Sequence, residues 1–340
     1  MKFSRSLNLC DNLIILDGLT GTGKTMFNQI LNNFNDLQNG RFDYFFEQLN
    51  IANYYQKIDA DTFNCIIKLL IDQKFYDDFI SREINLRPTD LSSIFKNKKK
   101  FSYILNLFSK DGINIEKKIN KENKYHFLIT HQLLKPMENM LKMNVIKNIK
   151  IIEVFRHPIY LVDHWYSYIN MHGNNARDFT LWFKYKNIEI PWFAEDWKND
   201  YISLDDYNRS VMAISKLTSD CLDIIDNNKY KDKIFNISFE HFVLNTDKYI
   251  RDLELFLDLK FSPSLFKILR KQNLPRKYIY QSLLRPIYSR YGVKQYNKLI
   301  SHSNDYNARL NTIKSKCNEN VFKIFNKSIE KYNDIFKIWF

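Results

Sequence analysis

A short apolar run, followed at once by a glycine-rich turn, constrains the fold of this chain more than any other feature of the sequence. The apolar run is Asn12–Asp17 and the turn is Gly18–Gly23. A continuous apolar run of this length is typical of a buried parallel strand. After the turn, Phe27, Ile30 and Leu31 recur with the spacing of a helix. The sequence therefore predicts the order strand, glycine loop, helix.

The turn fits a phosphate-binding pattern at every fixed position. Residues 18–25 read GLTGTGKT, which matches G-x-x-x-x-G-K-[ST]. Glycines let backbone N–H groups point at an anion, the following helix presents the positive end of its dipole, and the lysine adds a mobile charge. Three of the seven glycines of the chain lie in this turn, more than an ordinary strand-to-helix connection requires. We predict an anion-binding loop.

A later predicted strand lacks the ending that a magnesium-dependent nucleotide enzyme normally has. Such an enzyme places an Asp at the end of a neighbouring apolar strand. Here the run Ile149–Phe155 is followed by Arg156, and Glu153 lies inside the run. The loop is therefore predicted to hold its anion with cations, with no obligatory metal. An ATP- and magnesium-dependent small-molecule kinase that uses Lys24 and Thr25 is the first alternative.

Four apolar runs predict strands, at residues 12–17, 125–130, 149–155 and 233–238, and helical patterns separate them. Strands joined through helices favour a parallel sheet, which binds ligands at the carboxyl ends of its strands. We predict an α/β P-loop fold of three layers, with a central parallel sheet flanked by helices. It forms a single domain over residues 1–340, with helical insertions at about 41–120 and 172–225 and a closing helix at about 311–338.

Composition and charge indicate a globular protein with an anionic ligand or surface as partner. The 340 residues are 45% hydrophobic and 26% charged, which excludes disordered, collagen-like and coiled-coil classes. The formal net charge is +13. Nucleic acid is not an expected partner, because no stripe of Lys and Arg alternates with aromatic residues and zinc-finger spacing is absent. We interpret the basic run Lys96–Lys100 as a solvated loop.

Cysteine spacing and hydropathy predict a cytoplasmic protein, at most peripherally associated with a membrane. The four cysteines lack CxxC or Cys/His spacing, which indicates reduced thiols without structural zinc. The apolar run nearest the N-terminus, Leu13–Leu16, is too short for a signal peptide, and no stretch reaches the length of a membrane span.

A second motif follows the run Ile149–Phe155, which ends in Arg156-His157-Pro158 and then turns helical. Together with the loop, it resembles the nucleotide-dependent sulfotransferase family, whose donor is 3′-phosphoadenosine 5′-phosphosulfate. Members have a loop of the form G-x-x-[RK]-[ST]-G-T-T and a later strand that ends in R-x-P. In this chain Gly21 replaces the basic loop residue and Lys24 replaces the first threonine. The matching loop positions are Gly18, Thr22, Gly23 and Thr25.

The resemblance implies which residues bind the donor. In the family, the arginine of R-x-P and a serine eight residues later hold the 3′-phosphate, and this chain has His164 at the serine position. A histidine can still donate a hydrogen bond to phosphate. The donor-binding residues implied are Gly18, Leu19, Thr20, Gly21, Thr22, Gly23, Lys24, Thr25, Met26, Arg156 and His164.

The resemblance also implies two catalytic residues, His131 and Lys24. Thr130–Pro136 is similar to the K-T-H-x-P stretch of many members, in which the histidine is the general base, although Ile129 replaces its lysine. His131 follows a predicted strand, and a histidine of ordinary pKa, about 6.5, can accept a hydroxyl proton near neutral pH. The alternative is a structural histidine that caps the next helix. Lys24 is expected to neutralise charge on the oxygen that leaves.

Later segments extend the resemblance. Asn236–Phe242 and the helical pattern after it are similar to the family's Y-E-D-L segment and the F-L-G-L helix end. Arg276-Lys277 lies where some members have a basic donor-binding segment, but we interpret it as a solvated loop.

The sequence thus predicts a transferase that moves a sulfuryl group from the nucleotide donor to a hydroxyl or amine of a small-molecule or carbohydrate acceptor. The segments without a match, 41–120 and 172–225, leave the acceptor and the oligomeric state open. The second alternative is a catalytically inactive nucleotide-binding protein, which the departures at Gly21, Ile129 and His164 suggest.

Overall fold

The fold is built on a five-stranded parallel sheet. The computed structural model describes residues 2–90, 93–96, 100–108, 113–122, 124–171, 178–279 and 301–338. The strand order is β2-β3-β1-β4-β7, and every neighbouring pair is parallel. Each of the four predicted runs forms one of these strands, so the predicted parallel sheet is confirmed. The strands are β1 (Asn12–Asp17), β2 (Arg41–Phe42), β3 (His126–Ile129), β4 (Asn148–Phe155) and β7 (Ile234–Ser238).

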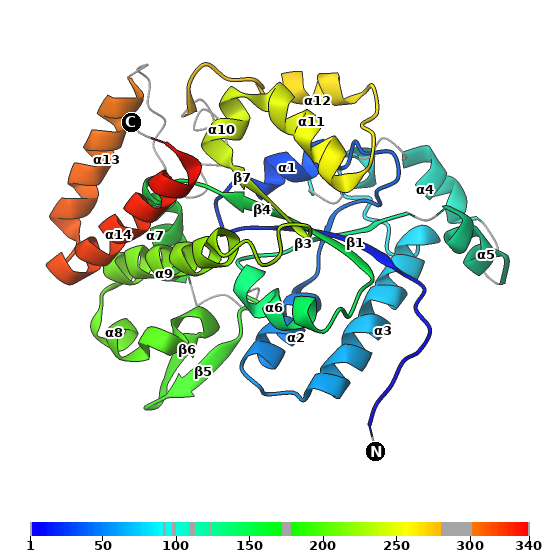
Figure 1. Ribbon diagram of the computed structural model, residues 1–340, viewed down its shortest axis with the longest axis horizontal. Helices are drawn as coiled ribbons and strands as arrows, with labels where there is room; N and C mark the ends of the chain where they lie inside the picture. Colours follow the sequence, from blue (N-terminus) through cyan, green and yellow to red (C-terminus); the bar gives the residue numbers. More distant parts are fainter. Residues whose placement is uncertain are drawn as a thin grey trace.

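Helices cover both faces of the sheet, which confirms the predicted three layers (Figure 1). One face carries α1 (Lys24–Leu31), α10 (Phe239–Leu244), α11 (Thr246–Leu257) and α12 (Leu265–Lys271). The other face carries α2 (Tyr44–Tyr54), α3 (Ala60–Phe79), α6 (Leu134–Lys142) and α9 (Asp206–Asp226). All six residues of β1 are buried between these layers, as expected for a central strand of a doubly covered sheet.

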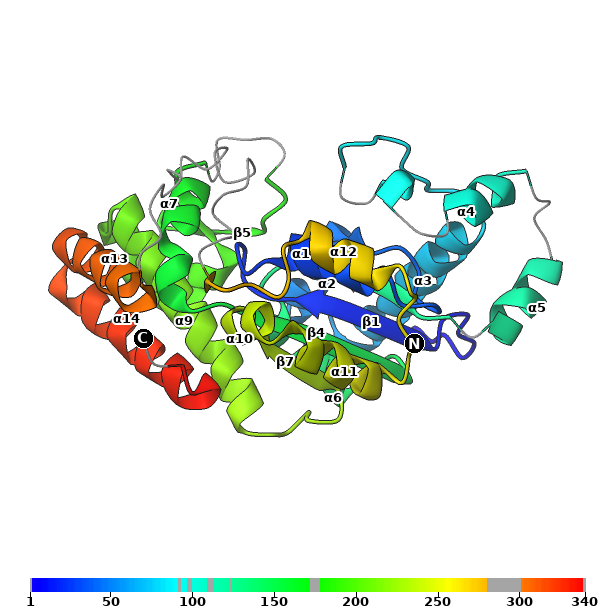
Figure 2. The same ribbon diagram turned by 90° about the horizontal axis from the view of Figure 1, so that it is seen from above.

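The first predicted insertion is mainly helical in the described residues. Besides β2, α2 and α3 it contains a 3-10 turn at Ile94–Lys96, α4 (Lys100–Asn106) and α5 (Ile113–Glu122). Figure 2 shows α4 and α5 at one end of the molecule, beyond α3 and away from the central sheet.

The second predicted insertion is not purely helical, and this part of the prediction needs correction. An antiparallel hairpin is formed by β5 (Trp182–Tyr185) and β6 (Ile188–Pro191). Its turn residues Lys186 and Asn187 have φ values of 47° and 62°. Positive φ at both central residues suits the twist of a two-residue hairpin, but Lys-Asn is not the usual Asn-Gly signature, so the sequence did not reveal it. A 3-10 helix (Trp192–Trp197), α8 (Lys198–Ser203) and α9 follow the hairpin.

The C-terminal segment contains two helices where the sequence pattern predicts one closing helix. They are α13 (His302–Lys316) and α14 (Glu319–Phe336). Cys317 is extended between them, and the side chain of Asn318 caps α14 by accepting a hydrogen bond from Val321 N at 2.9 Å. A cap of this kind interrupts an apolar periodicity that otherwise continues across the break.

A buried carboxyl group joins α14 to the sheet. Glu240, at the start of α10, accepts hydrogen bonds from Tyr332 Oη at 2.7 Å and from the backbone N of His157 at 3.1 Å. It also contacts Ser238 at the end of β7. The segment that resembles the family's Y-E-D-L therefore fixes the carboxyl ends of β4 and β7 to the C-terminal helix.

All four cysteines are free thiols. Among the described residues, no helix combines the length and the apolar character needed to cross a bilayer.

Two buried histidines should make the fold sensitive to acid. Burial lowers the pKa of His126 to about 3, helped by Arg41 and Lys74, and burial lowers the pKa of His157 to about 3. Unfolded histidine binds a proton near pH 6.5, so below that pH the unfolded state holds more protons than the folded state. We expect each histidine to reduce the free energy of unfolding by about 1.4 kcal/mol per pH unit below about pH 6.

Denaturant unfolding between pH 8 and pH 5 measures this slope. His126 Nδ1 lies 2.8 Å from Gln38 Oε1, and the amide of His126→Asn preserves a donor for that contact. In this variant the free energy of unfolding should depend less steeply on pH, by about 1.4 kcal/mol per pH unit, which is the contribution of one titrating histidine. An unchanged slope would show that His126 does not titrate in this way.

Candidate functional site

The site lies at the edge of the sheet where all the parallel strands end. Residues that follow different strands meet there: Gly18 after β1, Thr130 after β3, Arg156 after β4 and Phe239 after β7. The carboxyl edge of an open parallel sheet is the usual place for a ligand. The strand before His131 lies directly beside the loop strand, because β1 pairs with β3.

Three glycines of the loop have left-handed backbone conformations. Gly18, Gly21 and Gly23 have φ values of 139°, 94° and 102°. A Cβ atom on Gly18 would lie 2.3 Å from Val154 O, and one on Gly23 would lie 2.8 Å from the ring of Phe239. The loop thus needs glycine for its backbone angles and for its close approach to β4 and α10.

The remaining loop residues pack around this turn. Leu19 and Thr22 are buried, and Thr22 Oγ1 donates to Leu19 O at 2.9 Å. Thr25 is only partly buried in the first turn of α1, and Met26 is buried beside Arg276. The loop ends where Gly23 O accepts the first backbone bonds of α1.

Gly21 and His164, two of the departures from the motifs that the sequence resembles, lie next to each other in space. A Cβ atom on Gly21 would lie 3.0 Å from the imidazole of His164. A side chain at position 21 would therefore press against the ring of His164. Burial, followed by the charges of Arg156 and Lys24, lowers the pKa of His164 to about 4, so this imidazole is neutral near pH 7.

Lys24 is turned back onto its own loop. Its Nζ donates to Gly18 O and, at 3.0 Å, to Leu19 O, and the side chain is buried. Burial lowers the pKa of Lys24, against the pull of nearby carboxyl groups. To reach an anion above the loop, the ammonium group has to exchange these carbonyl partners for the anion.

Asp17, the last residue of β1, fixes the turn that carries His131. Its Oδ1 accepts from Thr130 Oγ1 at 2.9 Å and its Oδ2 accepts from Leu133 N at 2.7 Å. Gln132 N donates to Gly18 O at 3.1 Å. The turn is therefore bonded to the loop strand before and after His131. Burial and then the adjacent Asp17 raise the pKa of Glu153, which lies beside Asp17, well above its usual range.

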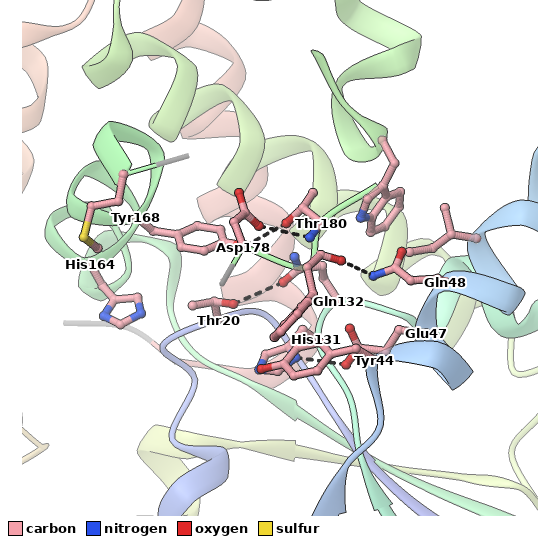
Figure 3. Close-up of a pocket in the computed structure, with 14 residues that line it drawn as sticks. Thr20, Tyr44, Glu47, Gln48, His131, Gln132, His164, Tyr168, Asp178 and Thr180 are labelled. Carbon is pink, nitrogen blue, oxygen red and sulfur yellow. Dashed lines mark hydrogen bonds and ion pairs between the residues drawn. The ribbon is translucent and has the colours of Figure 1, made fainter. Parts of the chain in front are cut away.

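His131 is oriented by a carboxylate and two aromatic rings. Its Nδ1 lies 2.9 Å from Glu47 Oε1. The imidazole stacks between Phe42, with ring centroids 5.0 Å apart, and Tyr44, at 6.0 Å, and both ring planes are within 11° of parallel. A carboxylate at this distance keeps the proton on Nδ1, which leaves the Nε2 lone pair as the acceptor. Figure 3 shows Glu47, Tyr44 and His131 together at the cavity wall.

Two arginines meet at Phe239, whose ring also packs against Gly23 of the loop. Arg156 donates to Gly21 O at 3.0 Å, lies 4.8 Å from the Phe239 ring centroid and is buried. Arg276 is also buried and lies 5.6 Å from the same centroid. The interpretation of Arg276 as part of a solvated loop is therefore wrong. Within the described part of the chain, Arg156 Nε has no hydrogen-bond partner.

A cavity of about 240 Å³ opens beside the loop (Figure 3). Of the predicted site residues, Thr20, His131 and His164 line it, whereas Lys24 and Arg156 do not. Other lining residues, missed by sequence reasoning, come from α2 and from the segment before β5. They include Tyr44, Glu47, Gln48, Asp178, Phe179 and Thr180. Glu47 lies on α2, just after β2, and a strand of two residues shows no periodicity by which the sequence could place this helix at the site.

The described residues contain no group of three or more His, Cys, Asp or Glu side chains arranged to hold a metal ion.

No protein-family model and no curated protein matches the chain. Similar solved structures include sulfotransferase STF9 from Mycobacterium avium, at 11% identity and a TM-score of 0.41, covering 98% of this chain and 78% of that one. The sulfotransferase domain from the curacin biosynthetic pathway has 10% identity and a TM-score of 0.40, covering 89% and 97%. Mouse sulfotransferase SULT7A1 complexed with PAP has 10% identity and a TM-score of 0.36, covering 93% and 88%. These identities are too low to assign an activity.

Proposed function

We propose that this protein transfers a sulfuryl group from 3′-phosphoadenosine 5′-phosphosulfate to a hydroxyl or amine of a small acceptor. The observation that carries the proposal is the arrangement around the loop. Thr20 of the loop and the imidazole of His131 line one cavity, while Arg156 and Arg276 lie together at the Phe239 ring beside the loop. An anion on the loop amides thus has a base in the adjoining cavity and two buried cations beside the loop.

The residues present suit a nucleotide with phosphates at two positions. The glycine turn at the start of α1 supplies backbone N–H groups for the 5′-phosphosulfate. Arg156 has a buried Nε without a partner among the described residues, and a guanidinium group binds phosphate oxygens through paired donors. We assign Arg156, with Arg276 beside it, to the 3′-phosphate. We assign to the neutral imidazole of His164 a hydrogen bond to the donor.

His131 and Lys24 are the proposed catalytic residues. His131 Nε2 takes the proton of the acceptor hydroxyl as the oxygen forms its bond to sulfur. The bond from sulfur to the bridging oxygen breaks, and the electron pair leaves with adenosine 3′,5′-bisphosphate. Lys24 neutralises that oxygen after its ammonium leaves Gly18 O and Leu19 O. Positioning and fixed charge supply the catalysis, so no metal is obligatory in this scheme.

We also propose that the chain acts as one domain in the cytoplasm. The four free cysteines are consistent with a reducing compartment.

A transfer assay with sulfur-labelled donor tests the proposed function. With a panel of phenols, alcohols and amines, we expect labelled product together with stoichiometric adenosine 3′,5′-bisphosphate, and the same rate in excess EDTA. Phosphorylated product from ATP that requires magnesium would instead support the kinase alternative. Donor binding without turnover across the panel would support an inactive nucleotide-binding protein.

A further inference from the structure

The helix α4 exposes an apolar face at one end of the molecule. The side chains of Phe101, Leu105 and Phe108 are 70%, 69% and 84% exposed. The helical turn continues past the end of α4, because the next two backbone N–H groups donate back into it at 3.2 and 3.1 Å. Residues four and seven positions after Phe101 therefore share its side of the helix. A contiguous apolar face exposed in this way marks a surface that binds a partner or a membrane.

The opposite side of α4 is fixed to the rest of the protein. Tyr103 Oη donates to Asp78 Oδ2 at 3.3 Å, and Asn106 Nδ2 donates to Phe79 O at 3.1 Å. Both acceptors lie at the end of α3. At 3.6 residues per turn, Tyr103 and Asn106 point away from the apolar face. The anchored side thus determines that the apolar face points outward.

Positive charge surrounds this face. Residues 93–124 contain nine lysines and three acidic residues, so they supply six of the thirteen net positive charges of the chain. Residues 97–99 of the basic run lie outside the described part of the chain, and their charge is a property of the sequence. Lys100 Nζ lies 5.2 Å from the ring centroid of Phe101. Lys117 and Lys121 are exposed one turn apart on the neighbouring helix α5 (Figure 2).

We propose that the α4 surface, formed by Lys100, Phe101, Leu105 and Phe108, docks the protein on an anionic lipid bilayer. The three apolar side chains enter the boundary between headgroups and acyl chains, and the lysines contact the anionic headgroups. Because α4 lies at one end of the molecule (Figure 2), its apolar face can meet a flat, fluid bilayer without a matching groove. A second copy of the chain fits less well, since two such surfaces would bring like charges together. The inference does not rest on the proposed function.

Vesicle flotation with the unaltered protein tests this docking. One set of vesicles is pure phosphatidylcholine, and the other also contains about 30% phosphatidylserine. We expect binding to the phosphatidylserine vesicles to be at least about tenfold tighter, and to weaken as salt is raised from about 0.1 M to about 0.5 M. Equal affinities for the two sets of vesicles, or no binding to either, would overturn the inference.

A matched pair of double variants locates the contact. Phe101→Ser with Leu105→Ser should lower the affinity for phosphatidylserine vesicles at least about tenfold. Leu255→Ser with Phe266→Ser removes the same two side-chain types from α11 and α12, where they are 78% and 76% exposed, and should leave the affinity unchanged. All four side chains are exposed, so both variants should keep the Tm of the unaltered protein. An equal loss in the two variants, or no loss in either, would refute the α4 surface.

Charge and the class of partner are tested separately. Lys100→Gln should lower the affinity for phosphatidylserine vesicles about fivefold, the contribution of one lysine near an anionic surface. Polyuridylate and polyglutamate probe the other anionic partners, a nucleic acid and an acidic protein. We expect any binding of either polymer to be insensitive to Phe101→Ser with Leu105→Ser. A polymer that binds more tightly than the vesicles and is weakened by that variant would replace the bilayer as partner and overturn the proposal.

Discussion

Replacing His131 by Ala should lower the transfer rate to an alkyl alcohol by about 10² to 10⁴, the usual contribution of a general base. Glu47 and the Phe42 and Tyr44 rings orient the imidazole, and Asp17 fixes its turn to the loop strand. The loss should appear in kcat, and the nucleotide affinity should stay nearly unchanged, because the nucleotide is assigned to the loop amides, Arg156 and Arg276. Steady-state kinetics with nucleotide titration in parallel measure both quantities.

The acceptor's own acidity provides the control for this prediction. A phenol that is already partly ionised needs less help in losing its proton, so His131→Ala should slow its transfer less than that of an alkyl alcohol. Glu47→Gln keeps an oxygen near Nδ1 but removes the charge, and as a change in a positioning residue it should cost less than His131→Ala. An equal loss for every acceptor, or no loss, would remove His131 from the proton transfer.

Replacing Lys24 by Met should lower the rate by about 10² to 10³ while the protein stays folded. This is the cost of removing one preorganised group that stabilises charge in the transition state. Met keeps much of the length and volume of the lysine chain, so the packing under the loop is largely retained. The hydrogen bonds from Nζ to Gly18 O and Leu19 O are lost, but so is the cost of burying an ammonium group.

Thermal unfolding beside single-turnover kinetics tests this separation. The variant should unfold within a few degrees of the unaltered protein, since a loss of about 1 kcal/mol shifts Tm by only a few degrees in a chain of this size. If Lys24→Met unfolds, the lysine is structural. If it turns over at the normal rate, the ammonium group does not reach the leaving oxygen and stays on the loop carbonyls.

Local sequence determined the part of the fold that supports the loop. The apolar run Asn12–Asp17 forms β1, and the glycines that follow adopt the positive φ values that only glycine accepts readily. The run before Arg156 forms β4 beside β1. These features depend on composition and spacing over a few residues, so a sequence pattern can reveal them.

The acceptor side of the site depends on contacts between distant segments, which sequence patterns do not show. Glu47 reaches His131 across 84 positions, and Gln48 reaches Phe179 across 131. The hairpin β5–β6 was missed because its turn lacks a recognisable signature. The proximity of Gly21 to His164 likewise appears only in three dimensions, where the imidazole of His164 fills the space next to the glycine.

Calorimetric titration with adenosine 3′,5′-bisphosphate and with adenosine 5′-phosphate, both in EDTA, tests the central claim most directly. The two nucleotides differ only in the phosphate assigned to Arg156 and Arg276. We predict that the bisphosphate binds at least about tenfold more tightly, the value of one good charge-assisted contact. Arg156→Ala should remove that advantage while leaving the affinity for the monophosphate nearly unchanged. Equal affinities of the unaltered protein for the two nucleotides would contradict the assignment of a sulfuryl donor to this loop.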